Sequence, residues 1–165
     1  MCHYVFISCF VAWLAGDGAA TIAAAFIGAS VVVAGYVFQQ RAVRRERRAA
    51  IYSEAIRAVE DYLEAPFLVI RREGRLESDR VLTTHISEIQ SRIAYYRALL
   101  KVDAPMAVAE SYDKLVRTAR AEAGGAMTEA WKSKPIRRSV DVPLGRRFDR
   151  GGSDAALDAL IRSMG

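Results

Sequence analysis

The feature that most constrains this chain is the junction between a long uncharged segment and a cluster of arginines. Residues 19–38 contain no charged side chain, and five arginines follow within the next ten residues. A helix of this length, at about 1.5 Å of rise per residue, is about 30 Å long and matches the hydrocarbon core of a bilayer. The segment therefore predicts one transmembrane helix over residues 19–38.

The arginine cluster predicts where that helix leaves the membrane and which way it faces. An arginine at the bilayer centre costs about 3 kcal/mol on insertion scales, and positive residues beside a span stay on the cytoplasmic side. Anionic headgroups also attract such residues. We therefore predict a single-pass protein of the cell membrane with a cytoplasmic C-terminal domain. Its membrane-surface and topology residues are Arg41, Arg44, Arg45, Arg47 and Arg48.

Residues 1–18 form a second apolar segment, which ends at Asp17-Gly18. We interpret it first as a segment at the outer membrane interface, where Tyr4 and Trp13 are suitable aromatic anchors. Its length is short for a span, but a first span of a hairpin is an alternative. A cleaved signal peptide and a start codon further downstream are two others.

Small residues recur along the predicted span. A stripe of this kind lets two helix backbones approach closely, so it predicts self-association of the span. The stripe consists of Ala20, Ala24, Gly28 and Gly35. The alternative is that alanine and glycine are simply frequent in membrane spans.

Residues 39–133 have helical periodicity and form the predicted cytoplasmic domain. The first helix should extend to about residue 72, and Pro66 should bend or interrupt it because proline has no N–H and clashes with the preceding turn. The polar residues 71–79, which include Gly74, then predict a connection.

The clearest pattern in the chain lies in the next helix. Six apolar residues are spaced alternately by four and three, which is a heptad seam. We predict that this helix-packing seam is buried and that Ser78 or Asp79 caps the start of the helix. The seam residues are Leu82, Ile86, Ile89, Ile93, Tyr96 and Leu100.

The rest of the chain predicts one long helix and a short final one. Asp103 and Pro105 should begin the third helix, and Gly124-Gly125 should end it, with a short helix following over residues 126–133. Residues 134–152 are basic and rich in proline and glycine, which predicts an extended strap. Ser153-Asp154 should cap a C-terminal helix over residues 153–165.

Together these patterns predict an all-α protein. An N-terminal transmembrane helix would precede a small cytoplasmic helical bundle, or an antiparallel coiled-coil hairpin. The net charge of +5 is uneven: residues 41–48 hold five Arg and one Glu, whereas residues 49–130 hold eleven basic and thirteen acidic residues. The excess of arginine over lysine and the abundance of alanine are typical of GC-rich bacterial genomes.

Motifs for chemistry are absent from the sequence. We find neither a Gly-rich phosphate loop nor a Gly-x-Ser-x-Gly turn, and residues 39–165 contain no cysteine and one histidine. His85 and Glu88 are three residues apart, but a metal site in a bundle requires further ligands. We therefore expect no catalytic residue, no cofactor, no metal and no small-molecule substrate. The arginines have no interleaved aromatic platform, so we also expect no nucleic acid partner.

These observations predict a membrane-anchored helical interaction or scaffold protein without catalytic activity. Its expected partners are a bilayer with anionic headgroups and either a second copy of the chain, as a homodimer, or another helical protein. One alternative is a two-span accessory protein of a membrane lesion or of transport. Another is an enzyme whose site has no recognisable motif.

Overall fold

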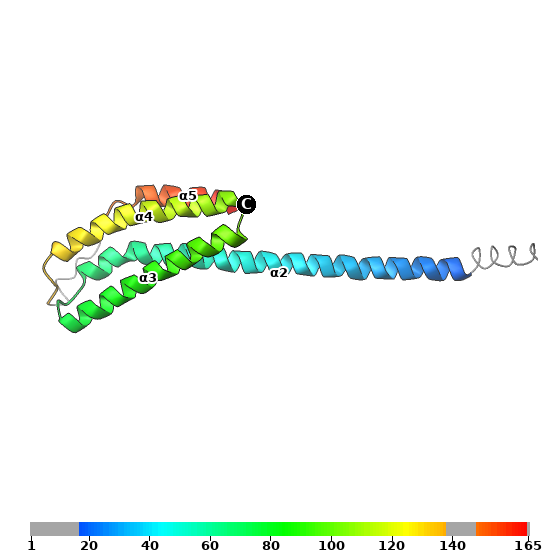
Figure 1. Ribbon diagram of the computed structural model, residues 1–165, viewed down its shortest axis with the longest axis horizontal. Helices are drawn as coiled ribbons and strands as arrows, with labels where there is room; N and C mark the ends of the chain where they lie inside the picture. The colour runs from blue at the N-terminus through cyan, green and yellow to red at the C-terminus, as the bar shows by residue number, and fades with distance from the viewer. Residues whose placement is uncertain (1–16, 138–147, 165) are drawn as a thin grey trace, which may run out of the picture. The chain divides into compact units, whose positions relative to one another are not determined.

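The computed structural model describes residues 17–137 and 148–164, and it describes side chains from Val33 onward within those ranges. The described regular structure is α-helical throughout. It consists of α2 (Asp17–Ile70), α3 (Leu76–Asp103), α4 (Met106–Lys132) and α5 (Gly151–Met164) (Figure 1). The prediction of an all-α protein is therefore confirmed for this part of the chain.

The chain divides into two compact units, residues 1–47 and residues 48–165. Among the residues that the structure describes, no helix is long and apolar enough to cross a membrane. The predicted span at 19–38 lies within α2, but the side chains of residues 17–32 are outside the described residues, as is the whole of segment 1–16. The membrane span therefore stays a prediction of the sequence.

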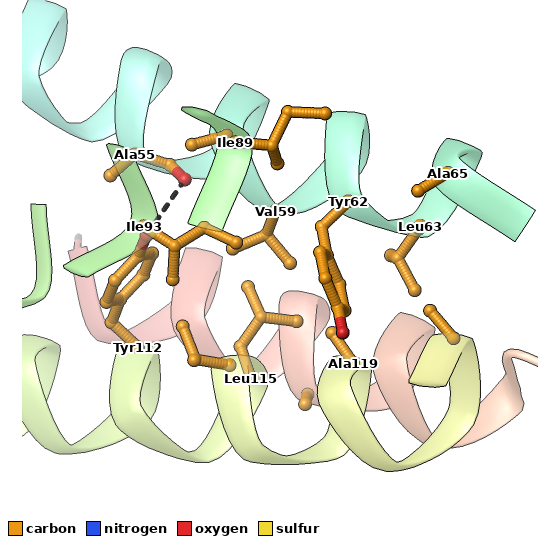
Figure 2. Packing of buried hydrophobic residues seen from close by; sticks show 14 of the residues in the cluster. Ala55, Val59, Tyr62, Leu63, Ala65, Ile89, Ile93, Tyr112, Leu115 and Ala119 are labelled. Carbon is orange, nitrogen blue, oxygen red and sulfur yellow. Dashed lines mark hydrogen bonds between the residues drawn. The ribbon is translucent and has the colours of Figure 1, made fainter. Parts of the chain in front are cut away.

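The second unit is a helical bundle with one apolar core. Its helices α4 and α5 lie side by side, and α3 also packs against α4. The part of α2 in this unit contributes Val59, Tyr62 and Leu63 to the same core (Figure 2). Four helices therefore share one core, which buries each amphipathic face that the sequence predicts.

Close approach of α4 and α5 follows from their small side chains. Ala119, Ala123, Ser153 and Ala156 are each at most 3% exposed. Small residues allow two helix backbones to approach closely, and the interior stays densely packed only if larger side chains elsewhere interdigitate. Leu160 fills that role from α5 and is fully buried.

Several predicted helix ends are wrong, for local physical reasons. Helix α3 begins at Leu76, before the predicted caps Ser78 and Asp79, because the chain reverses at Gly74, whose φ is +71°. It ends at Asp103, which was predicted to start the next helix. The residue before a proline disfavours helical backbone, so Ala104 is extended and Pro105 is the N-cap of α4.

Two predicted helix breakers lie inside helices. Helix α4 continues through Gly124-Gly125 to Lys132, so the separate short helix over 126–133 is also wrong. Each glycine costs about 1 kcal/mol relative to alanine. The burial of Met127 and Ala130 beyond the pair offsets this. At Pro66 the predicted interruption is wrong, because α2 continues through this buried residue to Ile70, whereas the alternative of a bend stays a prediction.

The predicted strap over residues 134–152 is described only at its two ends. Residues 134–137 and 148–150 have no regular structure, and residues 138–147 are outside the described residues. Helix α5 begins at Gly151, two residues before the predicted cap. The reason is a carboxylate from another helix: Glu122 of α4 accepts hydrogen bonds from the backbone N–H groups of Gly152 and Ser153.

Candidate functional site

The predicted membrane-surface arginines lie on α2 and are all exposed. Arg41, Arg44, Arg45 and Arg47 belong to the first unit, and Arg48 begins the second. None of them forms an ion pair with another residue that the structure describes. No described residue therefore neutralises these five charges, and each guanidinium group is available to bind an external anion.

The predicted self-association stripe is described at one position. An added Cβ at Gly35 would meet no atom within 4 Å, so the backbone there is open to a neighbour. The side chains of Ala20 and Ala24, and the surroundings of Gly28, are outside the described residues.

The predicted packing seam of α3 faces the core of the bundle. Ile86, Ile89, Ile93 and Leu100 are buried. The two remaining members, Leu82 and Tyr96, are partly buried against the same cluster. The seam thus packs within the bundle, and it is not the surface that α3 offers to a partner.

A second apolar surface lies on the outer side of α3. Tyr95 is 61% exposed and Val102 is 82% exposed, while Leu99 between them is half-buried. Their spacing of four and three places them on one face of the helix. Met106, the first residue of α4, is also exposed. We name Tyr95, Leu99 and Val102 the outer strip of α3.

The charged residue that the bundle buries most deeply among those described is Arg72, in the connection after α2. Its guanidinium donates hydrogen bonds to the backbone carbonyls of Val69, Ala130, Trp131 and Ser133. It also lies 4.9 Å from the centre of the Trp131 ring. The cation thus satisfies carbonyls at the C-terminal end of α4, where the helix dipole favours positive charge.

The same end of the bundle joins two connections through the backbone. The N–H of Ile136 donates to the carbonyl of Arg72 at 2.9 Å. The ring of Pro135 lies against Gly74, where an added Cβ would be 2.5 Å from Pro135 Cγ. We call this assembly of Arg72, Trp131, Pro135 and Gly74 the Arg72 node.

Two acidic residues of α2, Glu60 and Asp61, pair with basic residues from other parts of the bundle. Asp61 accepts from Arg92 of α3 at 2.8 Å, and Glu60 accepts from both terminal nitrogens of Arg150 at 2.9 and 3.1 Å. Arg150 also binds Asp154. The acidic cluster of α2 is therefore a set of contacts between elements of the bundle, and the arrangement supplies no pair of free carboxylates for acid–base chemistry.

A further ion pair joins α3 to α4. Arg97 Nε donates to Asp113 Oδ1 at 2.6 Å, and Lys101 lies 3.5 Å from the other carboxylate oxygen. The hydrogen bond from Arg97 is the main cause that lowers the pKa of Asp113, against a smaller opposing effect of burial. Asp113 thus stays ionised and holds the two helices in register.

The buried hydroxyl of Tyr112 joins α4 to α2. It donates to the carbonyl of Ala55 at 3.2 Å (Figure 2). Burial is the main cause that raises the pKa of Tyr112, and it also raises the pKa of Tyr62. Both groups are therefore neutral packing residues at ordinary pH, and neither is poised to transfer a proton.

An apolar groove of about 250 Å³ lies near the Arg72 node. Its lining combines Pro66, Phe67 and Ile70 of α2 with Ala126, Glu129 and Ala130 of α4 and with Phe148. The Phe67 and Phe148 rings are 5.6 Å apart. Its one carboxylate, Glu129, binds Lys132 at 2.7 Å, so the groove offers an apolar surface and no free titratable group.

No group of three or more potential metal ligands occurs among the described residues. His85 Nδ1 is 4.0 Å from Glu88 Oε2, and both side chains are more than half exposed. This pair has the geometry of a solvent-exposed contact.

Sequence reasoning missed the residues that organise the bundle, namely Arg72, Glu122 and Arg150. Arg150 and Glu60 are 90 positions apart, so no local pattern connects them. Arg72 gave a weak signal, because a basic residue after a helix is common and does not reveal that it caps a different helix.

Comparison with known proteins finds no matching family model, no similar curated protein and no similar solved structure.

Proposed function

We propose that this chain is a membrane-anchored helical interaction protein without catalytic activity, and that it self-associates. The anchor is the uncharged segment 19–38, and the arginines after it hold residues 49–165 on the cytoplasmic side. Its partners are a bilayer with anionic headgroups and a second copy of the chain.

The observation that carries the interaction role is the outer strip of α3. The opposite face of this helix already packs into the core, so the strip remains after the bundle has buried its own apolar faces. Neighbouring exposed apolar residues are typical of contact surfaces, whereas isolated ones are ordinary. Tyr95 adds a large amphipathic side chain of the kind that is enriched in interfaces.

Association through the outer strip also agrees with the charge pattern around it. Arg92, three residues before Tyr95 at the edge of the strip, is paired with Asp61 of the same bundle. Arg97 and Lys101 lie on the side of α3 that contacts Asp113 of α4. Two copies that meet through this face therefore bring together no unpaired basic side chain from residues 92–101.

The test is the mass of the full chain in a neutral detergent, measured by light scattering during size exclusion. We expect a dimer for the native sequence and a monomer for Val102→Glu, which places a charge within the contact, at the most exposed residue of the strip. Leu76→Glu is the matched control, because Leu76 is exposed on the same helix but lies outside the strip. A native chain that stays monomeric at every concentration tested would contradict the proposal.

The anchor has its own test. The full chain should remain in the membrane pellet after alkaline carbonate extraction, and a tag at the C-terminus should be protected from protease added to intact cells. Release of the chain by carbonate would contradict the anchor and would leave the self-association result unaffected.

A further inference from the structure

One face of α2 in the first unit combines an aromatic residue, an amide and two arginines around a single hollow. The hollow has a volume of about 310 Å³ and is lined by Tyr36, Val37, Gln40, Arg41 and Arg44. All five side chains are exposed. Their helical spacing places them on one side of the helix, whereas Arg45 does not line the hollow.

The polar groups of this face present several hydrogen-bond donors. Gln40 Nε2 donates to the Tyr36 hydroxyl oxygen at 3.0 Å, which leaves the hydroxyl hydrogen available for another acceptor. Arg41 and Arg44 have no ion-pair partner among the residues whose side chains are described. Guanidinium groups bind phosphate oxygens with two parallel hydrogen bonds, so the face matches a phosphate group.

The order of residues along the helix identifies the source of that phosphate. Val33, Tyr36, Val37 and Phe38 are exposed large apolar or aromatic residues, and they precede the arginines. From Tyr36 to Arg44 the rise is about 12 Å, which is enough to cross the headgroup and interfacial layer of about 5–7.5 Å on one side of a bilayer. Apolar and aromatic residues followed by arginines match the change from acyl chains through the interface to phosphates.

We propose that the face formed by Tyr36, Gln40, Arg41 and Arg44 binds the phosphate of an anionic phospholipid headgroup. The inference rests on the proposed membrane anchor and adds to it a particular lipid-binding face of α2. A nucleic acid would satisfy the same arginines but would leave Val33, Val37 and Phe38 in water, so the polarity of the helix favours the lipid.

The test uses the full chain in neutral detergent, titrated with phosphatidylglycerol or with phosphatidylcholine of the same acyl chains, and bound lipid is counted by native mass spectrometry. We expect preferential retention of phosphatidylglycerol. Arg44→Gln should weaken that binding about fivefold, the contribution of one arginine near an anionic surface. Arg45→Gln removes the same charge one residue away and should weaken it by less than half as much.

Two further arms separate the possible sources of the anion. Inorganic phosphate and a single-stranded oligonucleotide are each added as competitors, and neither should displace phosphatidylglycerol at equal concentration. Displacement by either one would overturn the lipid assignment, and so would an equal loss in Arg44→Gln and Arg45→Gln, which would show attraction to net charge alone. Arg57→Gln, in the second unit, controls for the change in total charge.

The outcomes distinguish this inference from the function on which it rests. A chain that resists carbonate extraction and forms dimers, but binds both lipids equally, contradicts the lipid-binding face alone. A chain that carbonate releases from the membrane contradicts the anchor itself.

Discussion

At the scale of single residues, the bundle buries a cation, Arg72, with no buried acidic side chain among the residues that the structure describes. Arg72 is 8% exposed, and its partners are backbone carbonyls. Several such carbonyls together compensate the charge, and each would lose a charged donor if the guanidinium were removed. We therefore expect the residue to stabilise the bundle by more than an exposed ion pair does.

We predict that Arg72→Met lowers the free energy of unfolding by about 3 kcal/mol, because it leaves carbonyls at the end of α4 without a donor. The unfolding free energy of Arg72→Lys should lie between those of Arg72→Met and the native protein, since a lysine keeps the charge but cannot form the same fork of hydrogen bonds. Urea unfolding of the full chain in detergent, followed by circular dichroism, gives both values.

Arg71→Met is the matched control for this prediction. The adjacent Arg71 is half exposed, and its contact with Glu64 is 3.7 Å long. Its loss should change the unfolding free energy by no more than about 0.5 kcal/mol. Equal losses of unfolding free energy in Arg71→Met and Arg72→Met would show that the hydrogen bonds from Arg72 to the carbonyls do not stabilise the bundle more than an exposed contact does.

At the scale of elements, two glycines have opposite roles in the same bundle. Gly74 has a positive φ and lies against Pro135, whereas Gly125 is helical and an added Cβ there would meet no atom within 4 Å. Alanine is favourable where the backbone is helical and unfavourable where φ is positive. The first glycine is thus required by the connection, and the second is not required by the packing of α4.

We predict that Gly74→Ala destabilises the bundle by about 1–3 kcal/mol, because it combines backbone strain with a clash against the Pro135 ring. Gly125→Ala should stabilise it by about 0.5–1 kcal/mol through helix propensity. Thermal unfolding of the two variants measures both changes. An unchanged or higher unfolding temperature in Gly74→Ala would mean that the connection relaxes at no cost and that the Arg72 node is not rigid.

The attachment of α5 provides the third prediction. An added Cβ at Gly152 would lie 2.6 Å from Glu122 Oε1 and 2.9 Å from Thr118 Cγ2, so Gly152→Ala should separate the start of α5 from α4. We expect faster amide hydrogen exchange in α5, with Leu160 as the reporter, and unchanged exchange in α3. Gly151→Ala is the control, because its nearest neighbour is the flexible Asp149 side chain at 3.3 Å.

The elements also show what the sequence could predict and why. The seam of α3 was predictable because the spacing of Ile86, Ile89 and Ile93 is local and needs only a partner surface. The continuation of α4 through Gly124-Gly125 depends on packing beyond the pair, and propensity alone cannot weigh that burial. The start of α5 depends on Glu122, a residue of another helix, so its cap was invisible in the local sequence.

The candidate surfaces divide in the same way. The exposed arginines were identifiable from charge alone, but the selection of Arg41 and Arg44 onto one face with Tyr36 required the helix geometry. The seam was identifiable, whereas the outer strip was not, because Val102 and Tyr95 differ from core residues only in where the bundle places them. Sequence periodicity identifies the apolar residues of a helix, but it does not show which of them stay exposed after the helix has packed against its neighbours.

At the scale of the whole molecule, the stability of the bundle should be limited at both extremes of pH by identifiable groups. The folded pKa of Asp113 is lowered by Arg97 and Lys101. The contribution of Asp113 to the unfolding free energy is therefore present above its unfolded pKa of about 3.9 and is lost as the pH falls through the folded pKa. The folded pKa of Tyr112 is raised by burial, so its contribution is present below about pH 10 and is lost as the pH rises further.

We predict that the unfolding free energy stays level between these limits and falls on either side. In Asp113→Asn the decrease of the unfolding free energy at acid pH (the acid limb) should be shallower, because the residue no longer takes up a proton on unfolding. In Tyr112→Phe the value at neutral pH should be about 1 kcal/mol lower, since the hydrogen bond to the Ala55 carbonyl is lost, and the alkaline limb should be shallower. Burial also raises the pKa of Tyr62, so part of the decrease at alkaline pH should remain in Tyr112→Phe and should disappear only when Tyr62 is replaced by phenylalanine as well.

Urea unfolding across the pH range measures all three effects. An alkaline decrease that is identical in Tyr112→Phe and the native protein would show that the Tyr112 hydroxyl does not couple ionisation to folding.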